Sequence, residues 1–138
     1  MNLEECFAKG LLKRARPDPG NARRSLEVSK SYFQDALKNH DIKCYRVVVI
    51  LCYTSIFHAA RSLLYKDGVK ERSHVCIPIY IRARYPELKS YANMMDSYRE
   101  LRHGVFYRLR ETVEEMEASE ALSSAKEFLA QIGMMVEG

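Results

Sequence analysis

The 138-residue sequence has no tryptophan and little glycine or proline, with six and four copies respectively. Because tight turns depend on glycine and proline, their scarcity disfavours a sheet built from many hairpins. Long apolar runs are also missing. The longest stretch without a formal charge, 47–60, lies between Arg46 and Arg61 and is too short to span a bilayer. Charged side chains interrupt residues 1–15, which therefore lack the apolar core of a signal peptide. We expect a cytoplasmic protein without membrane contact.

Signatures of common enzyme classes are absent as well. The sequence contains no glycine-rich phosphate loop, no H-E-x-x-H motif and no G-x-S-x-G motif. Its acidic residues are not clustered for metal binding, and no Glu-x-x-His pair suggests a di-iron bundle. The formal net charge of +4 is too small to indicate a nucleic-acid-binding protein by itself. The placement of individual charges must therefore indicate the function.

The four cysteines, Cys6, Cys44, Cys52 and Cys76, form no C-x-x-C pair. On a helix Cys44 and Cys52 would lie two turns apart, which is too far for a disulfide. A zinc site built from Cys76 and His74 is disfavoured, because residues two apart do not share a helical face. We expect reduced thiols that pack as small apolar side chains, with no bound metal and no cofactor.

Composition and periodicity predict one all-α domain. Apolar residues make up 47% of the chain and charged residues 29%, as in soluble globular proteins. A Pro-Asp-Pro-Gly break separates a short helix in residues 1–20 from a helical bundle in 21–138. Apolar residues then recur every three or four positions in long segments that start near residues 21, 42, 86 and 112, with a shorter segment ending near 84. The prediction is an up-and-down four-helix bundle with one or two additional short helices.

The second long segment has an alternative interpretation. Its run 47–51, Val-Val-Val-Ile-Leu, is compatible with a strand, because β-branched residues favour sheets. The apolar pattern nevertheless continues at helical spacing to Leu64, and no turn signal occurs before Asp67 and Gly68. A helix that is apolar on nearly every side is one surrounded by others, so we place this segment at the centre of the bundle.

One helical face in the segment 98–110 carries candidate chemistry. Arg99, Arg102, His103, Phe106 and Arg110 share this face, which is turned away from the core stripe. Arginine binds phosphate, histidine exchanges a proton near neutral pH, and an aromatic ring stacks on a base. The set suits RNA binding or metal-free RNA cleavage by the 2′-hydroxyl. The alternative is a solvated arginine face on which Phe106 belongs to the core or to a dimer contact.

The other histidines have plainer interpretations. His58 lies in the apolar central segment, where a buried, hydrogen-bonded ring is the simplest role. His74 lies just before a short helix and is interpreted as a cap, and His40 lies in a connection.

Three further patterns resemble those of a known family. The run Phe57-His-Ala-Ala-Arg61 within 52–64 resembles the central helix of prokaryotic HEPN proteins. Arg72-Ser-His74 resembles the basic-x-His of the same subgroup, and residues 125–129 resemble its last helix. The resemblance covers residues 21–132 and implies a bundle of four or five helices that forms a homodimer.

The resemblance also implies a function. Many HEPN proteins act with a minimal nucleotidyltransferase partner as a toxin–antitoxin pair, and active members are metal-independent endoribonucleases. Their hallmark is an arginine, four to six residues and a histidine at the dimer interface, whereas only three residues separate Arg99 from His103 here. We expect an interaction module with a nucleotidyltransferase partner and RNA or nucleotide as a further ligand. The alternatives are an active endoribonuclease using Arg99, Arg102 and His103, and a structural dimer without ligand.

The resemblance implies one candidate modification. In HEPN toxins a tyrosine just after the motif histidine can be adenylylated, which silences the toxin. The nearest downstream tyrosine here is Tyr107, four residues after His103. Residues four apart share a helical face, so an added phosphate would lie near His103 and Arg110. The alternative is an ordinary surface or interface tyrosine.

Overall fold

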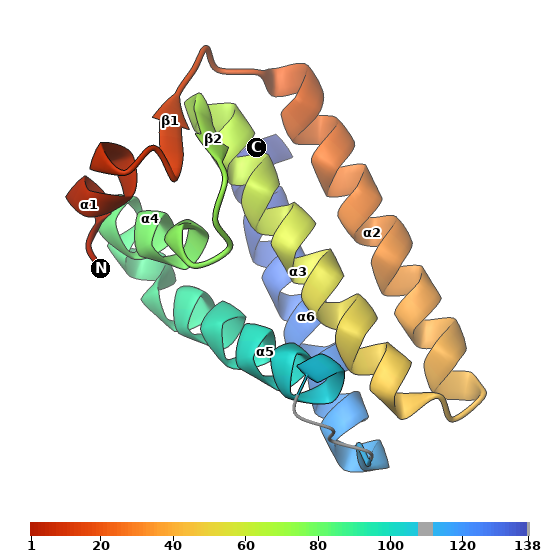
Figure 1. Ribbon diagram of the computed structural model, residues 1–138. Helices are drawn as coiled ribbons and strands as arrows, with labels where there is room; N and C mark the ends of the chain where they lie inside the picture. Colours follow the sequence, from red (N-terminus) through yellow and green to blue (C-terminus); the bar gives the residue numbers. More distant parts are fainter. Residues whose placement is uncertain (108–111, 138) are drawn as a thin grey trace.

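The computed structural model describes residues 1–107 and 112–137 and confirms the predicted all-α class (Figure 1). Its long helices are α2, α3, α5 and α6, with α1 and α4 as the additional short ones. A two-stranded sheet, β1 and β2, and a 3-10 turn, η1, were not predicted. The elements in chain order are α1 Leu3–Ala8, β1 Leu12–Arg14, α2 Pro19–Asp41, α3 Tyr45–Asp67, β2 Val69–Glu71, α4 Cys76–Arg84, η1 Pro86–Leu88, α5 Lys89–Tyr107 and α6 Glu115–Glu137.

Helix α3 is the centre of the bundle. It packs against α2, α5 and α6 (Figure 1). Its buried side chains run from Val48 to Leu64. By length and composition alone it could cross a membrane, but 61% of its most apolar 18-residue window is buried inside the protein. That burial identifies α3 as a core helix, which explains why its apolar residues continue around every face.

The connection after α3 depends on Gly68. This residue ends the helix in the left-handed conformation, with φ of 77° and ψ of 47°. Its carbonyl oxygen accepts a hydrogen bond from the backbone nitrogen of Ala15 at 2.8 Å. Strand β2 then pairs antiparallel with β1, with Leu12 opposite Glu71. The N-terminal segment is thereby attached to the chain that leaves the central helix.

The expectation of four reduced thiols is wrong for two of them. Cys6 in α1 and Cys76 at the start of α4 form a disulfide, although 70 positions separate them in the sequence. The pairing of β1 with β2 carries α1 across to α4 and brings the two Cα atoms to 6.0 Å. Cys44 and Cys52 remain free thiols, and burial raises the pKa of Cys52 to about 12. Disulfides are rare in the cytoplasm, so the predicted location stays a prediction.

Candidate functional site

A histidine from a turn lies against the central helix. His74 occupies the connection between β2 and α4, and its Nδ1 lies 2.8 Å from the hydroxyl of Tyr53 in α3. Tyr53 is almost completely buried, with 1% of its surface exposed. The His74 ring also stacks on Phe57, with 4.3 Å between ring centroids and 12° between planes. A hydrogen bond and a stacking contact therefore fix an exposed imidazole on the surface of α3.

Helix α5 places Arg102 beside the same tyrosine. The guanidinium carbon of Arg102 lies 5.5 Å from the ring centroid of Tyr53 and 5.1 Å from that of Phe106. Both distances are within the range of a cation–π interaction. Tyr53 consequently contacts His74 through its hydroxyl and Arg102 through its ring face.

Arg99 lies one turn earlier on α5 and is incompletely paired. Its Nη2 lies 3.2 Å from a carboxylate oxygen of Asp96, and the other oxygen of Asp96 accepts a hydrogen bond from Arg82 at 2.9 Å. One carboxylate is therefore shared between two guanidinium groups. Nη1 of Arg99 is buried and has no hydrogen-bond partner within residues 1–107 and 112–137. A buried donor without a partner costs about 1–3 kcal/mol, and an acceptor that reached it would recover this cost.

The protonation states in this cluster follow from burial and charge. Partial burial of the ring against Phe57 and Tyr53 lowers the pKa of His74, although the residue is exposed on its other side, and the charges of Arg102 and Arg99 lower it further. The imidazole is therefore neutral near pH 7. Burial also raises the pKa of Tyr53 to about 12, although both arginines act in the opposite direction, so its hydroxyl keeps its proton. Two guanidinium groups, a neutral imidazole and a phenol form a cationic cluster that favours an anion. We name Arg99, Arg102, Tyr53 and His74 the α5 arginine site.

The structure separates the residues predicted for one face of α5. Arg99 and Arg102 lie in the α5 arginine site, and Phe106 lies beside Arg102 with 49% of its surface exposed. The ring of exposed His103 contacts Tyr107 instead, with 4.8 Å between centroids. Tyr107 is 67% exposed, as a surface tyrosine would be. Arg110 lies outside the described residues.

The prediction that His74 caps a helix is wrong. Helix α4 begins after Val75 without any side-chain capping bond, so His74 is not a cap. Its contacts are with α3 instead, because the short turn after β2 folds back over Tyr53 and Phe57. The basic-x-His pattern at 72–74 was the one signal in the sequence that singled out this histidine. His58 is half-buried and stacks on Tyr32 at 5.5 Å.

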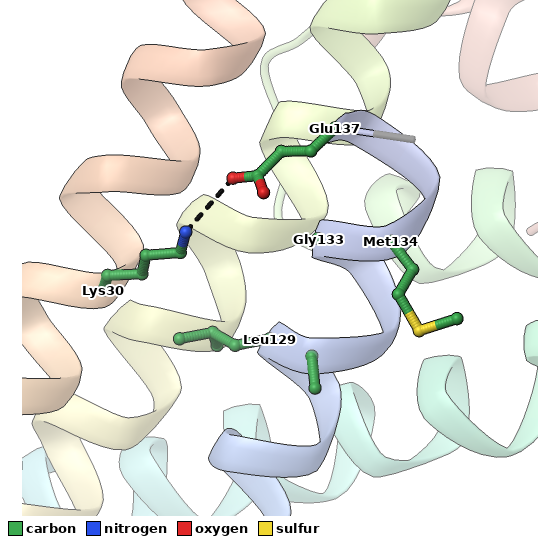
Figure 2. A pocket seen from close by; sticks show the side chains of 6 residues that line it. Lys30, Leu129, Gly133, Met134 and Glu137 are labelled. Carbon is green, nitrogen blue, oxygen red and sulfur yellow. Dashed lines mark hydrogen bonds and ion pairs between the residues drawn. The ribbon is translucent and has the colours of Figure 1, made fainter.

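Other parts of the surface are weaker candidates for a functional site. No group of three His, Cys, Asp or Glu side chains is placed to hold a metal ion in the part of the chain that the structure describes. A pocket of about 630 Å³ lies between α2 and α6. Figure 2 shows Leu129, Gly133 and Met134, which line it. Lys30 and Glu137 form an exposed ion pair of 3.1 Å at its edge. Because Lys30 and Glu137 neutralise each other, the pocket has no net positive charge that would attract an anion.

The fold and the site together define a helical-bundle domain with a cationic cluster on its third long helix. The family model of the HEPN domain matches residues 9–134. The chain belongs to the HEPN domain family, which confirms the resemblance drawn from the sequence. No curated protein matches the sequence.

Proposed function

We propose that this HEPN domain is an interaction module whose α5 arginine site binds a phosphate group of RNA or of a nucleotide. The observation that supports it is the buried Nη1 of Arg99, which has no acceptor among the described residues. A phosphate oxygen is an acceptor that guanidinium groups bind strongly. Arg102 lies one turn further along the same helix and supplies a second cation. Phe106 beside it has an exposed ring on which a base can stack, as in recognition of single-stranded RNA.

The binding test compares arginines inside and outside the site. We expect Arg102→Ala to weaken binding of a fluorescent oligouridylate about tenfold, because one charge-assisted hydrogen bond contributes roughly 1.5 kcal/mol or more. The slope of log affinity against log salt should decrease by about 0.7, the value of one contact to single-stranded RNA. Arg23→Ala changes an exposed arginine on α2 and serves as the matched control. Fluorescence anisotropy measures both quantities. Equal losses in the two variants would exclude a specific site.

Metal-independent RNA cleavage is the second candidate function. The 2′-hydroxyl would lose its proton and attack the neighbouring phosphorus. The bond from phosphorus to the 5′-oxygen of the next nucleotide would break and that oxygen would take up a proton, which leaves a 2′,3′-cyclic phosphate. The arginines would stabilise the charge that develops on the phosphate oxygens. Arg99 and His103 lie four residues apart on a helix, so both side chains can reach one bound phosphate. Cleavage unaffected by EDTA and abolished by His103→Ala would support this function. Cleavage that survives His103→Ala would exclude His103 as the catalytic residue.

The exposed end of α5 is the proposed interface of a homodimer. Phe106 and Tyr107 expose 49% and 67% of their surfaces, and both lie close in sequence to His103. A two-fold axis here would bring Arg99 and Arg102 near their own copies, which a phosphate between the subunits would neutralise. Sedimentation should show a dimer at high micromolar concentration. A monomer throughout that range would contradict the proposal.

The proposed protein partner is a minimal nucleotidyltransferase, in a cytoplasmic toxin–antitoxin pair. Its action would join AMP from ATP to the Tyr107 oxygen and release pyrophosphate. Tyr107 is exposed and contacts His103, so the added phosphate would lie beside that imidazole. Incubation with the partner and ATP, followed by mass spectrometry, should show AMP on Tyr107. AMP on another residue would exclude Tyr107 from this role.

A further inference from the structure

His74 is held so that one ring nitrogen faces away from its anchor. Nδ1 makes the hydrogen bond to Tyr53, and the ring face stacks on Phe57. Nε2 has no hydrogen bond to any residue that the structure describes. Because the Tyr53 hydroxyl keeps its proton, it can donate to Nδ1, which leaves the proton of the neutral imidazole on Nε2. The ring therefore offers a positioned donor beside the two arginines.

Charged groups around His74 determine the pH at which its imidazole gains a second proton. Tyr53 and His58 act on it from α3, and Arg99 and Arg102 act from α5. Asp96 and Glu100 pair with Arg99 at 3.2 Å and 3.8 Å, and Asp96 also pairs with Arg82. Three guanidinium groups then face two carboxylates, so the free site keeps a surplus of positive charge. An incoming anion would offset the two guanidinium charges and add an acceptor for Nε2. Both changes favour the imidazolium form.

We propose that His74 is the proton-linked third cation of the α5 arginine site, and that the site prefers the dianionic phosphate monoester at an RNA end over an internal phosphodiester. On binding, a proton from solvent adds to Nδ1 of His74, and the Tyr53 hydroxyl turns to accept it. Nε2 donates to the phosphate, so the bound site has three positive charges. This inference rests on the proposed phosphate binding and specifies both the ligand class and its pH dependence.

The direction of the pH dependence follows from linkage. The pKa of His74 is lowered in the free protein and is raised when the dianion binds. Between these two pKa values the complex holds more protons than the free protein, so affinity increases as the pH falls. Above the pKa of the complex the dependence on His74 disappears. The phosphate monoester itself is mostly dianionic at pH 7, because its second pKa lies near 6.

The test uses a tetrauridylate with a 5′-phosphate and the same oligonucleotide without it. Isothermal titration at pH 7 in buffers of different ionisation enthalpy gives the number of protons taken up on binding. Wild type should take up a measurable fraction of a proton and prefer the phosphorylated probe about tenfold. His74→Gln should lose both the uptake and the preference. His40→Gln is the matched control, because His40 lies at the end of α2 and contacts Ser119 and Tyr45, outside the α5 arginine site, and it should keep both.

The outcomes separate this inference from the proposed function. Uptake that persists in His74→Gln, or that disappears in His40→Gln, would overturn the role of His74. Binding by wild type without proton uptake would also overturn it, while phosphate binding would stand. If wild type binds neither probe, both proposals fail. The Cε1 proton resonance of His74, titrated with and without the phosphorylated probe, gives the two pKa values directly and needs no variant.

Discussion

Gly68 allows a sharp test of how the N-terminal segment is attached to the bundle. Its left-handed conformation costs an alanine about 1 kcal/mol more than a glycine. An added Cβ would also lie 2.6 Å from the backbone oxygen of Ala15 and 2.9 Å from the backbone nitrogen of Pro17. Both contacts involve backbone atoms, which cannot rotate away. The segment before α2 would therefore have to move, and its hydrogen bond to Gly68 would break.

The size of the effect follows from these two costs. Losing the bond from Ala15 to Gly68 and displacing the backbone adds about 1–2 kcal/mol to the conformational cost. We expect Gly68→Ala to lower the free energy of unfolding by about 2–3 kcal/mol, and Tm by about 7–10 °C for a domain of this size. Urea unfolding followed by circular dichroism measures the first quantity, and a thermal scan measures the second.

Gly104 provides the matched control for this prediction. It lies inside α5, and a Cβ there would have no neighbouring atom within 4 Å among the described residues. Alanine is the better helix former by roughly 1 kcal/mol, so Gly104→Ala should stabilise the protein. The same substitution is thus expected to lower the free energy of unfolding at position 68 and to raise it at position 104. A Gly68→Ala protein as stable as wild type would refute the argument from conformation and close contact.

Two further changes test the attachment of α1 and the packing of α2 on α3. Cys6→Ser removes the disulfide to Cys76 that closes a loop of 70 residues, which should lower the free energy of unfolding by roughly 4 kcal/mol. Reduced wild type should unfold at the same urea concentration as this variant, and a difference would contradict the bond. Ser29→Ala removes a buried hydroxyl that donates to the carbonyl oxygen of Ser55 at 2.8 Å. Its expected cost is about 1 kcal/mol, and no loss would exclude a stabilising role for this bond.

The long helices were predictable because the pattern that specifies each one lies within its own segment of the sequence. A period of three to four residues persists over each of them, and Gly68 ends α3 where the sequence indicated a stop. The start of α6 was less certain: the pattern suggested residue 112, whereas the helix begins at Glu115. Helix ends depend on caps and on the preceding connection, which periodicity does not describe.

The remaining features depend on contacts between distant segments. The strands β1 and β2 have three residues each, too few for alternation to be recognised. The pairing of Cys6 with Cys76 depends on the contact between those strands, which connects α1 to the chain that leads into α4. His74 belongs to a turn, and its contact with Tyr53 spans 21 positions. Arg99 and Arg102 were found from the sequence because they share one helix, whereas the contact that places His74 beside them could not be predicted.

Joint binding of one phosphate by Arg99 and Arg102 can be measured in an NMR spectrum of the arginine Nε–Hε groups, assigned with single variants and recorded during titration with the 5′-phosphorylated tetrauridylate. The signals of Arg99 and Arg102 should shift together and saturate at one equivalent per site, while that of exposed Arg23 does not move. Shifts confined to other arginines, with Arg99 and Arg102 unchanged, would show that these two residues do not bind the phosphate.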